Sequence, residues 1–150
     1  MAAVGNLLWF IFGGFELALI WLAIGCFFYL TIIGIPIGRA CFEFAKLSAF
    51  PYGKEIIRAA ELMGKQNVSL FSRVIHFVLN LIWLPIGVIL TICHLLLGIL
   101  YAVTIIGIPV AVVHLRMGRF LLAPVGCRVV SKEQALASQT ANELEKRLRN

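Results

Sequence analysis

Long apolar runs alternate with short polar segments along this chain, and the runs are long enough to cross a membrane as helices. The first run covers residues 11–30 and the second covers residues 85–103. At a rise of 1.5 Å per residue each helix would be about 29 Å long, close to the roughly 30 Å hydrocarbon core of a bilayer. The pattern therefore predicts two membrane-length helices. A flanking helix over residues 75–84 leads into the second membrane-length helix, and Pro85 lies in the first turn of that second helix.

The chain contains an internal repeat. The hexapeptide Thr-Ile-Ile-Gly-Ile-Pro at residues 31–36 returns unchanged at residues 104–109, an offset of 73. Two further motifs keep the same order: Asn6-Leu-Leu-Trp9 with Gly13 returns as Asn80-Leu-Ile-Trp83 with Gly87, and Pro51 with Gly53 returns as Pro124 with Gly126. The first of these has an offset of 74, so one residue differs inside the first apolar helix. We interpret the chain as two tandem units of the same design.

Each unit breaks its apolar helix at the Gly-Ile-Pro motif, because proline has no amide donor and disfavours a helical residue before it. The helix-break residues are Gly34, Pro36, Gly107 and Pro109. The segments that follow, residues 36–50 and 109–123, would form helices only about 22 Å long. They are predicted either to be short return crossings or to be re-entrant half-helices, and the sequence leaves both alternatives open.

The composition excludes an ordinary water-soluble domain. Hydrophobic residues make up 61% of the 150 residues and charged residues only 13%, against roughly 45–50% and about 25% in soluble chains. There are 13 Lys and Arg against 7 acids, all of them Glu. The basic residues flank the apolar runs, which favours a membrane protein over a nucleic-acid-binding protein. Because basic segments follow both units, we expect both to face the cytoplasm, together with both termini, in a multi-pass topology.

The last segment of the chain is polar and predicts a cytoplasmic helix. Ser131 and Gln134 have the spacing of a capping box at its start. An apolar stripe repeats along it at spacings of four, three and four: Ala137, Ala141, Leu144 and Leu148. The stripe is too short for a convincing coiled coil. We therefore leave open a solvated helix and a weak oligomer contact.

These patterns together predict an all-α, multi-pass membrane helical bundle made of two tandem helix–Gly-Ile-Pro–helix repeats, with a C-terminal cytoplasmic helix. The expected organisation is a first membrane hairpin repeat (residues 1–53), a cytoplasmic connecting segment (54–73), a second membrane hairpin repeat (74–130) and a cytoplasmic helical tail (131–150).

The paired motifs, with the Phe50-Pro-Tyr-Gly-Lys54 passage and the Pro124-Val-Gly-Cys-Arg-Val-Val130 passage, resemble the YccF family of bacterial inner-membrane proteins. The resemblance covers residues 6 to about 131. It implies a multi-pass location in the bacterial cytoplasmic membrane, and it implies no activity and no catalytic residues. Lys54 follows the first Pro-x-Gly where Cys127 and Arg128 follow the second, so the two halves do not share a strict basic residue there.

Two polar residues lie inside the apolar runs. A charged Glu16 at mid-membrane would cost on the order of 2.5–3.5 kcal/mol, so we expect its side chain to face the bundle or a wet cavity. It would act there as an ion or proton ligand, or bond to a neighbouring helix as a shallow acid. His94 stands beside Cys93, but adjacent helical residues point about 100° apart and chelate poorly. The position favours an interhelical hydrogen bond over a metal site.

The strongest functional candidate is a charged helix face after each Gly-Ile-Pro motif. Its members are Arg39, Glu43, Lys46, Arg116 and Arg119. One hypothesis is a homo-oligomeric ion channel or small-solute transport component in which these residues line the path. The alternative is a non-transporting structural or regulatory subunit whose basic residues bind anionic lipid headgroups or a partner protein. No Ser-His-Asp set or phosphate-binding loop occurs, so we expect no enzyme, cofactor or metal.

Overall fold

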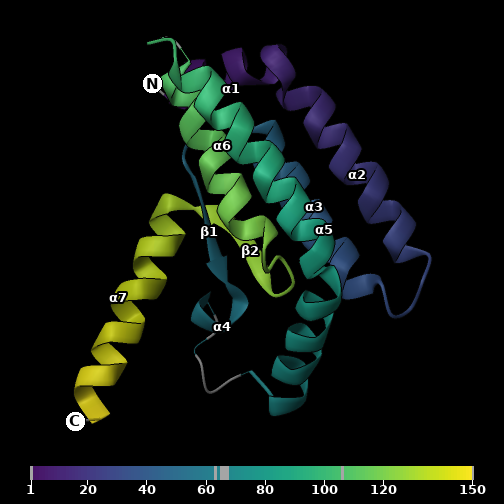
Figure 1. The fold of residues 1–150 in the computed structure, drawn as a ribbon. Coiled ribbons are helices and arrows are strands. Elements are labelled where there is room, and N and C mark those ends of the chain that lie inside the picture. Colours follow the sequence, from purple (N-terminus) through teal and green to yellow (C-terminus); the bar gives the residue numbers. More distant parts are fainter. Residues whose placement is uncertain (1, 63, 65–67, 106, 150) are drawn as a thin grey trace. The chain divides into compact units, whose positions relative to one another are not determined.

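The computed structural model describes residues 2–62, 64, 68–105 and 107–149 and is mostly helical (Figure 1). Its elements are α1 (Ala2–Trp9), the π-helical turn η1 (Phe10–Gly14), α2 (Phe15–Tyr29), α3 (Ile35–Ala49), β1 (Lys54–Arg58), α4 (Ala59–Leu62), α5 (Leu70–Ala102), α6 (Ile108–Leu121), β2 (Cys127–Ser131) and α7 (Lys132–Arg149). They form two compact units, Met1–His76 with Gly126–Asn150, and Phe77–Val125. The helical class is confirmed, and the two strands depart from the all-α expectation.

In the first unit, α2 and α3 pack against each other as a helical hairpin. The chain leaves α2 at Tyr29 and enters α3 at Ile35, so Gly34 and Pro36 lie at the boundary between the two helices. The apolar face of α3 is buried along its length: Ile37, Ala40, Cys41, Phe44 and Leu47. This is the face that the spacing of apolar residues predicts, because positions three and four apart share one side of a helix.

The two hairpins carry the same hydrogen bonds at their open ends. In the first unit Trp9 Nε1 donates to Ser48 O at 2.6 Å, and in the second Trp83 Nε1 donates to Leu121 O at 2.9 Å. Asparagine side chains bridge the backbone in the same way: Asn6 donates to Tyr52 O and accepts from Tyr52 N, and Asn80 donates to Val125 O and accepts from Val125 N. The Asn-x-x-Trp motif thus fastens the start of each hairpin to its end.

The one-residue difference between the two halves lies in η1. A π turn holds one more residue than an α turn, and here Phe15 N donates to Phe10 O, five residues earlier. Gly13 lies in this turn at φ +132°, a conformation that a side chain would strain. Gly14, not Gly13, is the structural counterpart of Gly87, because a Cβ on Gly14 would clash with Trp9 and Ser48 O and one on Gly87 with Trp83 and Leu121 O.

In the second hairpin, α5 is continuous from Leu70 to Ala102, and Pro85 lies inside it. The prediction that Pro85 begins a separate helix is therefore wrong. Proline removes one helical hydrogen bond and usually kinks a helix. Apolar helices of membrane proteins nevertheless accept it where the surroundings satisfy the freed backbone groups. The predicted flanking helix and the predicted span form one element.

The two strands form an antiparallel ribbon that the sequence did not predict. Ile56 pairs with Val129 at its centre, and the register runs outward from there to Lys54 with Ser131 and Arg58 with Cys127. Under the 73-residue offset Ile56 corresponds to Val129, so the ribbon pairs a segment with its own counterpart. The bonds at its ends are reciprocal as well: Ala59 N donates to Gly126 O, and Lys132 N donates to Gly53 O.

The ribbon changes the interpretation of the connecting segment. Residues 54–73 were expected to link the repeats, but they begin with β1 and α4, and residues 63 and 65–67 lie outside the described part. β2 follows the second hairpin along the chain, yet it lies in the first unit, against α3. The pairing with β1, 73 residues away, places β2 in this unit.

α7 begins with the expected capping box, in which Gln134 N donates to Ser131 Oγ and Ser131 N donates to Gln134 Oε1. Its contact with α4 is polar, because Ser138 Oγ and Asn142 Nδ2 both donate to Glu61 O. The apolar stripe of α7 is exposed in this chain. Both alternatives for the stripe, a solvated helix and an oligomer contact, therefore stay open.

Candidate functional site

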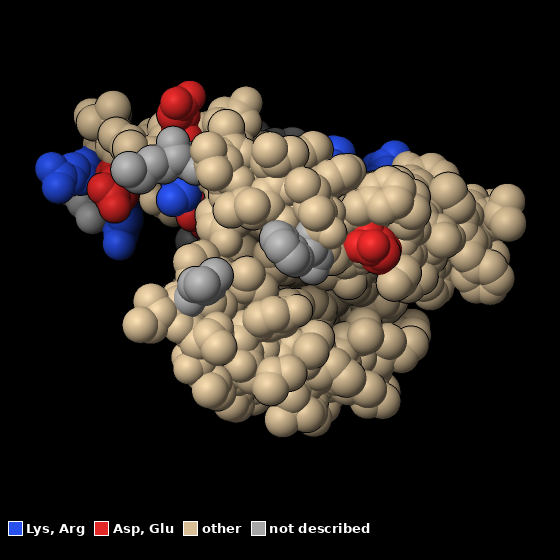
Figure 2. Space-filling model, turned by 90° about the horizontal axis from the view of Figure 1, so that it is seen from above, with Lys and Arg blue, Asp and Glu red and all other residues tan. Residues whose placement is uncertain are grey.

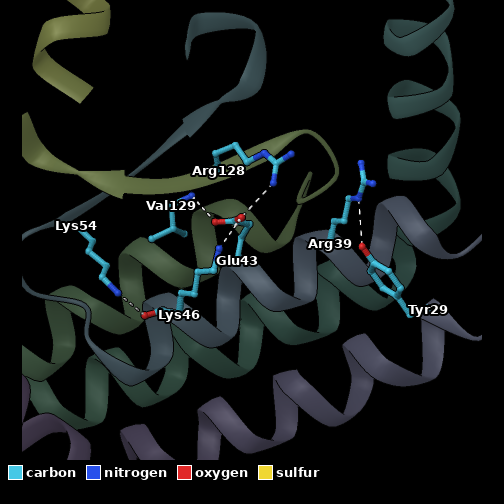
Figure 3. A network of polar contacts seen from close by, with 7 residues as sticks. All are labelled: Tyr29, Arg39, Glu43, Lys46, Lys54, Arg128 and Val129. Atoms are coloured by element: carbon cyan, nitrogen blue, oxygen red, sulfur yellow. Dashed lines mark hydrogen bonds and ion pairs between the residues drawn. The ribbon is translucent and has the colours of Figure 1, made fainter. Parts of the chain in front are cut away.

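The carboxylate of Glu43 is the centre of a polar network on α3 (Figure 3). One oxygen accepts from Lys46 Nζ at 3.1 Å and from Arg128 Nη1 at 3.2 Å, and the other accepts from Val129 N at 2.9 Å. The Glu43 side chain is 9% exposed, whereas that of Lys46 is 59% exposed. The buried acid is thus neutralised by two bases and also binds the backbone of β2, which holds the ribbon on the helix.

Two further bases belong to the same group of polar contacts. Arg39 Nε donates to Tyr29 Oη at 3.3 Å, and Lys54 Nζ donates to Lys46 O at 3.0 Å. The network in Figure 3 therefore contains one acid and four bases. Burial lowers the pKa of Lys54, and the positive charge of Lys46 lowers it further, while Glu43 acts in the opposite direction. We call this cluster the Glu43 network.

The predicted five-residue face is divided between the two units. Arg39, Glu43 and Lys46 lie on α3 in the first unit, whereas Arg116 and Arg119 lie on α6 in the second. Arg116 is half-buried and Arg119 is exposed. The partners found for Glu43 come from its own helix and from β2.

Glu16 does not point into the hairpin, as its position in an apolar run had suggested. α2 buries Ala18, Trp21 and Gly25, and Glu16 is exposed. At 100° per residue Glu16 lies about 140–200° around the helix from those three residues. Glu16 is therefore not buried in the first hairpin, and the expectation that it faces a wet cavity stays a prediction.

The second unit contains a buried histidine pair between α5 and α6. His94 Nδ1 lies 3.0 Å from His114 Nδ1, and the ring of Tyr101 stacks on His114 with centroids 5.5 Å apart. One imidazole donates and the other accepts, so the pair is an interhelical hydrogen bond of the kind that His94 was expected to make. In the part of the chain that the structure describes, no three His, Cys, Asp or Glu side chains are grouped to hold a metal ion.

Sequence reasoning missed two partners, His114 for His94 and Arg128 for Glu43. The first had a usable signal, since both histidines lie ten residues from Thr104, and residues equidistant from the turn of a hairpin face each other. Arg128 offered no such signal, because it is 85 residues from Glu43 and reaches it through a strand that was not predicted.

Large apolar side chains are exposed along α2 and α5, and most of the face seen in Figure 2 is formed by uncharged residues. Among the described helices, α5 is long and apolar enough to cross a bilayer, and α2 is a shorter apolar helix. A mostly helical chain with this much exposed apolar surface belongs to the class of helical membrane proteins.

Comparisons with known proteins agree with this class. The model of the YccF family, described as an inner membrane component domain, matches residues 4–54 and 78–127. The chain is 41% identical over 145 residues to Inner membrane protein YccF of Escherichia coli (strain K12), covering 95% of this chain and 96% of that protein. The protein of the same name from Shigella flexneri matches to the same extent. No solved structure matches the chain significantly.

The chain therefore belongs to the YccF family, and its relatives support a location in the bacterial inner membrane.

Proposed function

We propose that this protein is a non-transporting structural or regulatory subunit of the inner membrane that binds anionic phospholipid headgroups through the Glu43 network. The observation that carries the proposal is that one buried acid is paired with two partly exposed bases, Lys46 and Arg128, and that a third exposed base, Arg39, lies one helical turn away on α3. Two of those bases, Arg39 and Lys46, have exposed side chains on the same helix as an apolar face. Basic residues next to an apolar, membrane-embedded surface attract anionic lipid, at about 1 kcal/mol for each Lys or Arg near the surface.

The same geometry favours lipid binding over an ion path. A cation or anion path needs polar groups that remain available to a passing ion. Glu43 instead has three partners within hydrogen-bond distance, and one of them is a backbone amide that cannot move without breaking the ribbon off α3. By the positive-inside rule, the basic network faces the cytoplasm, where anionic lipids make the leaflet surface negative.

The test measures thermal unfolding of the protein in nanodiscs of pure phosphatidylcholine and in nanodiscs with added phosphatidylglycerol. We expect the anionic lipid to raise the Tm of the natural chain and to raise it much less in the double variant Arg39→Gln/Lys46→Gln. The matched control is Lys132→Gln/Arg147→Gln, which removes the same charge from exposed positions on α7 and should keep the response.

Flux through proteoliposomes supplies the second arm of the test. Vesicles that stay tight to salt under a gradient support the proposal. A current that changes when Arg39 or Arg116 is neutralised would overturn it in favour of an ion conduit. Equal stabilisation of both double variants by phosphatidylglycerol would also contradict the proposal, because the network would then contribute no specific binding.

A further inference from the structure

We infer that the turn between α2 and α3 is inserted into the acyl chains of one leaflet and returns without reaching the far side of the membrane. The surface concerned is the turn itself, Leu30–Ile33, with the outward face of α2, and its partner is lipid hydrocarbon. This inference does not depend on which headgroups the Glu43 network binds.

The turn is apolar and almost fully exposed. Leu30, Ile32 and Ile33 are 85%, 88% and 79% exposed. Residues 17–38 contain no Asp, Glu, Lys or Arg, so no charge marks the turn as a loop in water. Three neighbouring side chains of this size would be costly to leave in water, at about 25 cal/mol for each Å² of apolar surface. Lipid removes that cost.

Much of the backbone of the turn is hydrogen-bonded within the turn itself. Leu30 N, Thr31 N and Gly34 N donate to carbonyls within residues 27–31, and Ile35 N donates to Ile32 O. The one polar side chain of the turn is also satisfied locally, since Thr31 Oγ1 donates to Phe28 O and accepts from Gly34 N. Unsatisfied backbone groups cost several kcal/mol each in the bilayer core. Four backbone donors at the turn, those of Leu30, Thr31, Gly34 and Ile35, thus have partners within it.

The depth of insertion follows from the Glu43 network. The ribbon lies along α3 at the level of Glu43, where Arg128 and the amide of Val129 contact the carboxylate (Figure 3). Arg128 and Lys46 have partly exposed side chains there, and a ribbon with such residues belongs at the membrane surface. The start of α3 at Ile35 is eight residues away, which is about 12 Å along a helix. Since the core is about 30 Å thick, the turn ends near the bilayer midplane.

A spanning hairpin conflicts with this distance. If the turn reached the opposite surface, the Glu43 network and the ribbon would lie deep in hydrocarbon, at the cost of buried charge. Arg39 fits the re-entrant placement: it is one helical turn from Ile35, and a long arginine side chain can extend its charged end toward the surface while its stem stays in lipid. The hydrogen bond from Arg39 Nε to Tyr29 Oη satisfies one donor of the guanidinium group.

The experiment places single cysteines at Ile32 and, as a second variant, at Ile33, in a background where Cys26, Cys41, Cys93 and Cys127 are replaced by alanine. Each protein is reconstituted into phosphatidylcholine/phosphatidylglycerol vesicles. We expect a membrane-impermeant maleimide to label both positions at least about tenfold more slowly in vesicles than in detergent, from either side, because water is absent from the bilayer core. A nitroxide at Ile32 should be accessible to oxygen and shielded from a nickel chelate, at a depth of about 12 Å.

Lys132→Cys, exposed at the start of α7, reports the side on which the ribbon lies and should be labelled rapidly from that side. Labelling of Ile32→Cys and Ile33→Cys from the opposite side would overturn the inference by showing a full crossing. Rapid labelling from the same side as Lys132→Cys would overturn it by showing a hairpin that lies flat on the surface. Thermal unfolding of each variant establishes that the labelled protein is folded.

Discussion

At the scale of single residues, Glu43 connects two elements of the first unit that are far apart in the sequence. Its carboxylate joins α3 to β2, and the backbone amide of Val129 has this carboxylate as an acceptor. A buried acid is stabilising only while its partners are present, and removing one member of such a group leaves the others desolvated and unpaired. The loss of stability on substitution should therefore grow with the number of partners that are left unpaired.

We predict that Glu43→Ala lowers the free energy of unfolding by roughly 2–4 kcal/mol, because the Val129 amide loses its acceptor and Arg128 its partner. Glu43→Gln should cost less, since one amide oxygen can still accept from Val129 N. Lys46→Ala should cost less than about 1 kcal/mol, because the Lys46 side chain is largely exposed and water screens its charge. Unfolding by denaturant in detergent micelles measures all three. Equal losses for Glu43→Ala and Lys46→Ala would show that the bond to the strand contributes nothing.

Cys127, at the start of β2, gives a prediction of pH dependence. Burial raises the pKa of its thiol above the ordinary 9.0, Arg58 opposes that shift, and Glu61 adds to it. As the pH rises past 9.0 the unfolded chain loses the thiol proton while the folded chain keeps it, so stability falls until the folded pKa is passed. We expect Cys127→Ala to lose less stability than the natural chain between pH 8 and pH 10.

The variant Arg58→Gln is the companion measurement for Cys127. Removing the positive charge should raise the pKa of the thiol further, so the loss of stability at alkaline pH should become larger than in the natural chain. If the difference between the natural chain and Cys127→Ala did not change with pH, the assignment of this dependence to Cys127 would be wrong.

At the scale of elements, the two hairpins make the same tryptophan contacts, although their first helices differ in length by one residue between the tryptophan and the glycine. Trp83 and Gly87 are four residues apart in a regular α-helix, and Trp9 and Gly14 are five apart across η1. Both pairs end in the same contacts, with the indole bonded to a carbonyl of the returning segment. The π turn absorbs the extra residue so that the contacts on both sides of it remain in place.

Deletion of Gly13 should therefore be tolerated. It would shorten the first helix to the spacing of the second and remove the residue at φ +132°, so we expect the free energy of unfolding to stay within about 1 kcal/mol of the natural value. Deletion of Ala23, in the regular part of α2, is the matched control. It should rotate the remainder of the helix by about 100° and abolish cooperative unfolding, because Gly25 would leave the α3 interface. Equal damage from both deletions would contradict a role for η1 as an inserted residue.

The helices could be predicted from local signals, but the π turn η1 and the continuation of α5 through Pro85 could not. Apolar runs and the Gly-Ile-Pro motif lie within a few residues of the boundaries that they define, and α3 and α6 begin one residue before their prolines. The prediction that a helix begins at Pro85 was wrong because proline is common in the first turn of a helix, whereas here the apolar helix continues through it. The offset of 74 against 73 showed that one residue was extra, but the sequence allowed two counterparts for Gly87, Gly13 at an offset of 74 and Gly14 at an offset of 73.

At the scale of the whole molecule, the ribbon brings together segments that no local pattern connects. β1 and β2 have five residues each and lie next to basic loops, so each alone is typical of a connecting segment. Their pairing depends on a partner 73 residues away. The Glu43 network depends on that pairing in turn, which is why the charged residues of α3 were predictable as a face of a helix but their closed contact with Arg128 and Val129 was not.

The register of the ribbon can be tested by a crosslink between its central residues. Val129 N is bonded to Glu43 and not to Ile56, so Ile56 and Val129 form a pair without mutual backbone hydrogen bonds. The Cα atoms of such pairs are about 4.5 Å apart, within the range that a disulfide accepts. In a background without the natural cysteines, Ile56→Cys/Val129→Cys should form a disulfide under mild oxidation and raise the free energy of unfolding by about 2–4 kcal/mol, because it closes a long loop.

A crosslink shifted by one residue is the decisive comparison. Glu55→Cys/Val129→Cys places the two side chains on opposite faces of the ribbon, since neighbouring residues of a strand alternate, and it should not oxidise under the same conditions. Non-reducing gel mobility and unfolding with and without a reductant distinguish the two variants. If the shifted pair oxidised as readily as the central pair, the register would be wrong. The backbone donor to the Glu43 carboxylate would then no longer be Val129 N, and the depth inferred for the α2–α3 turn, which is measured from that contact, would have to be set again.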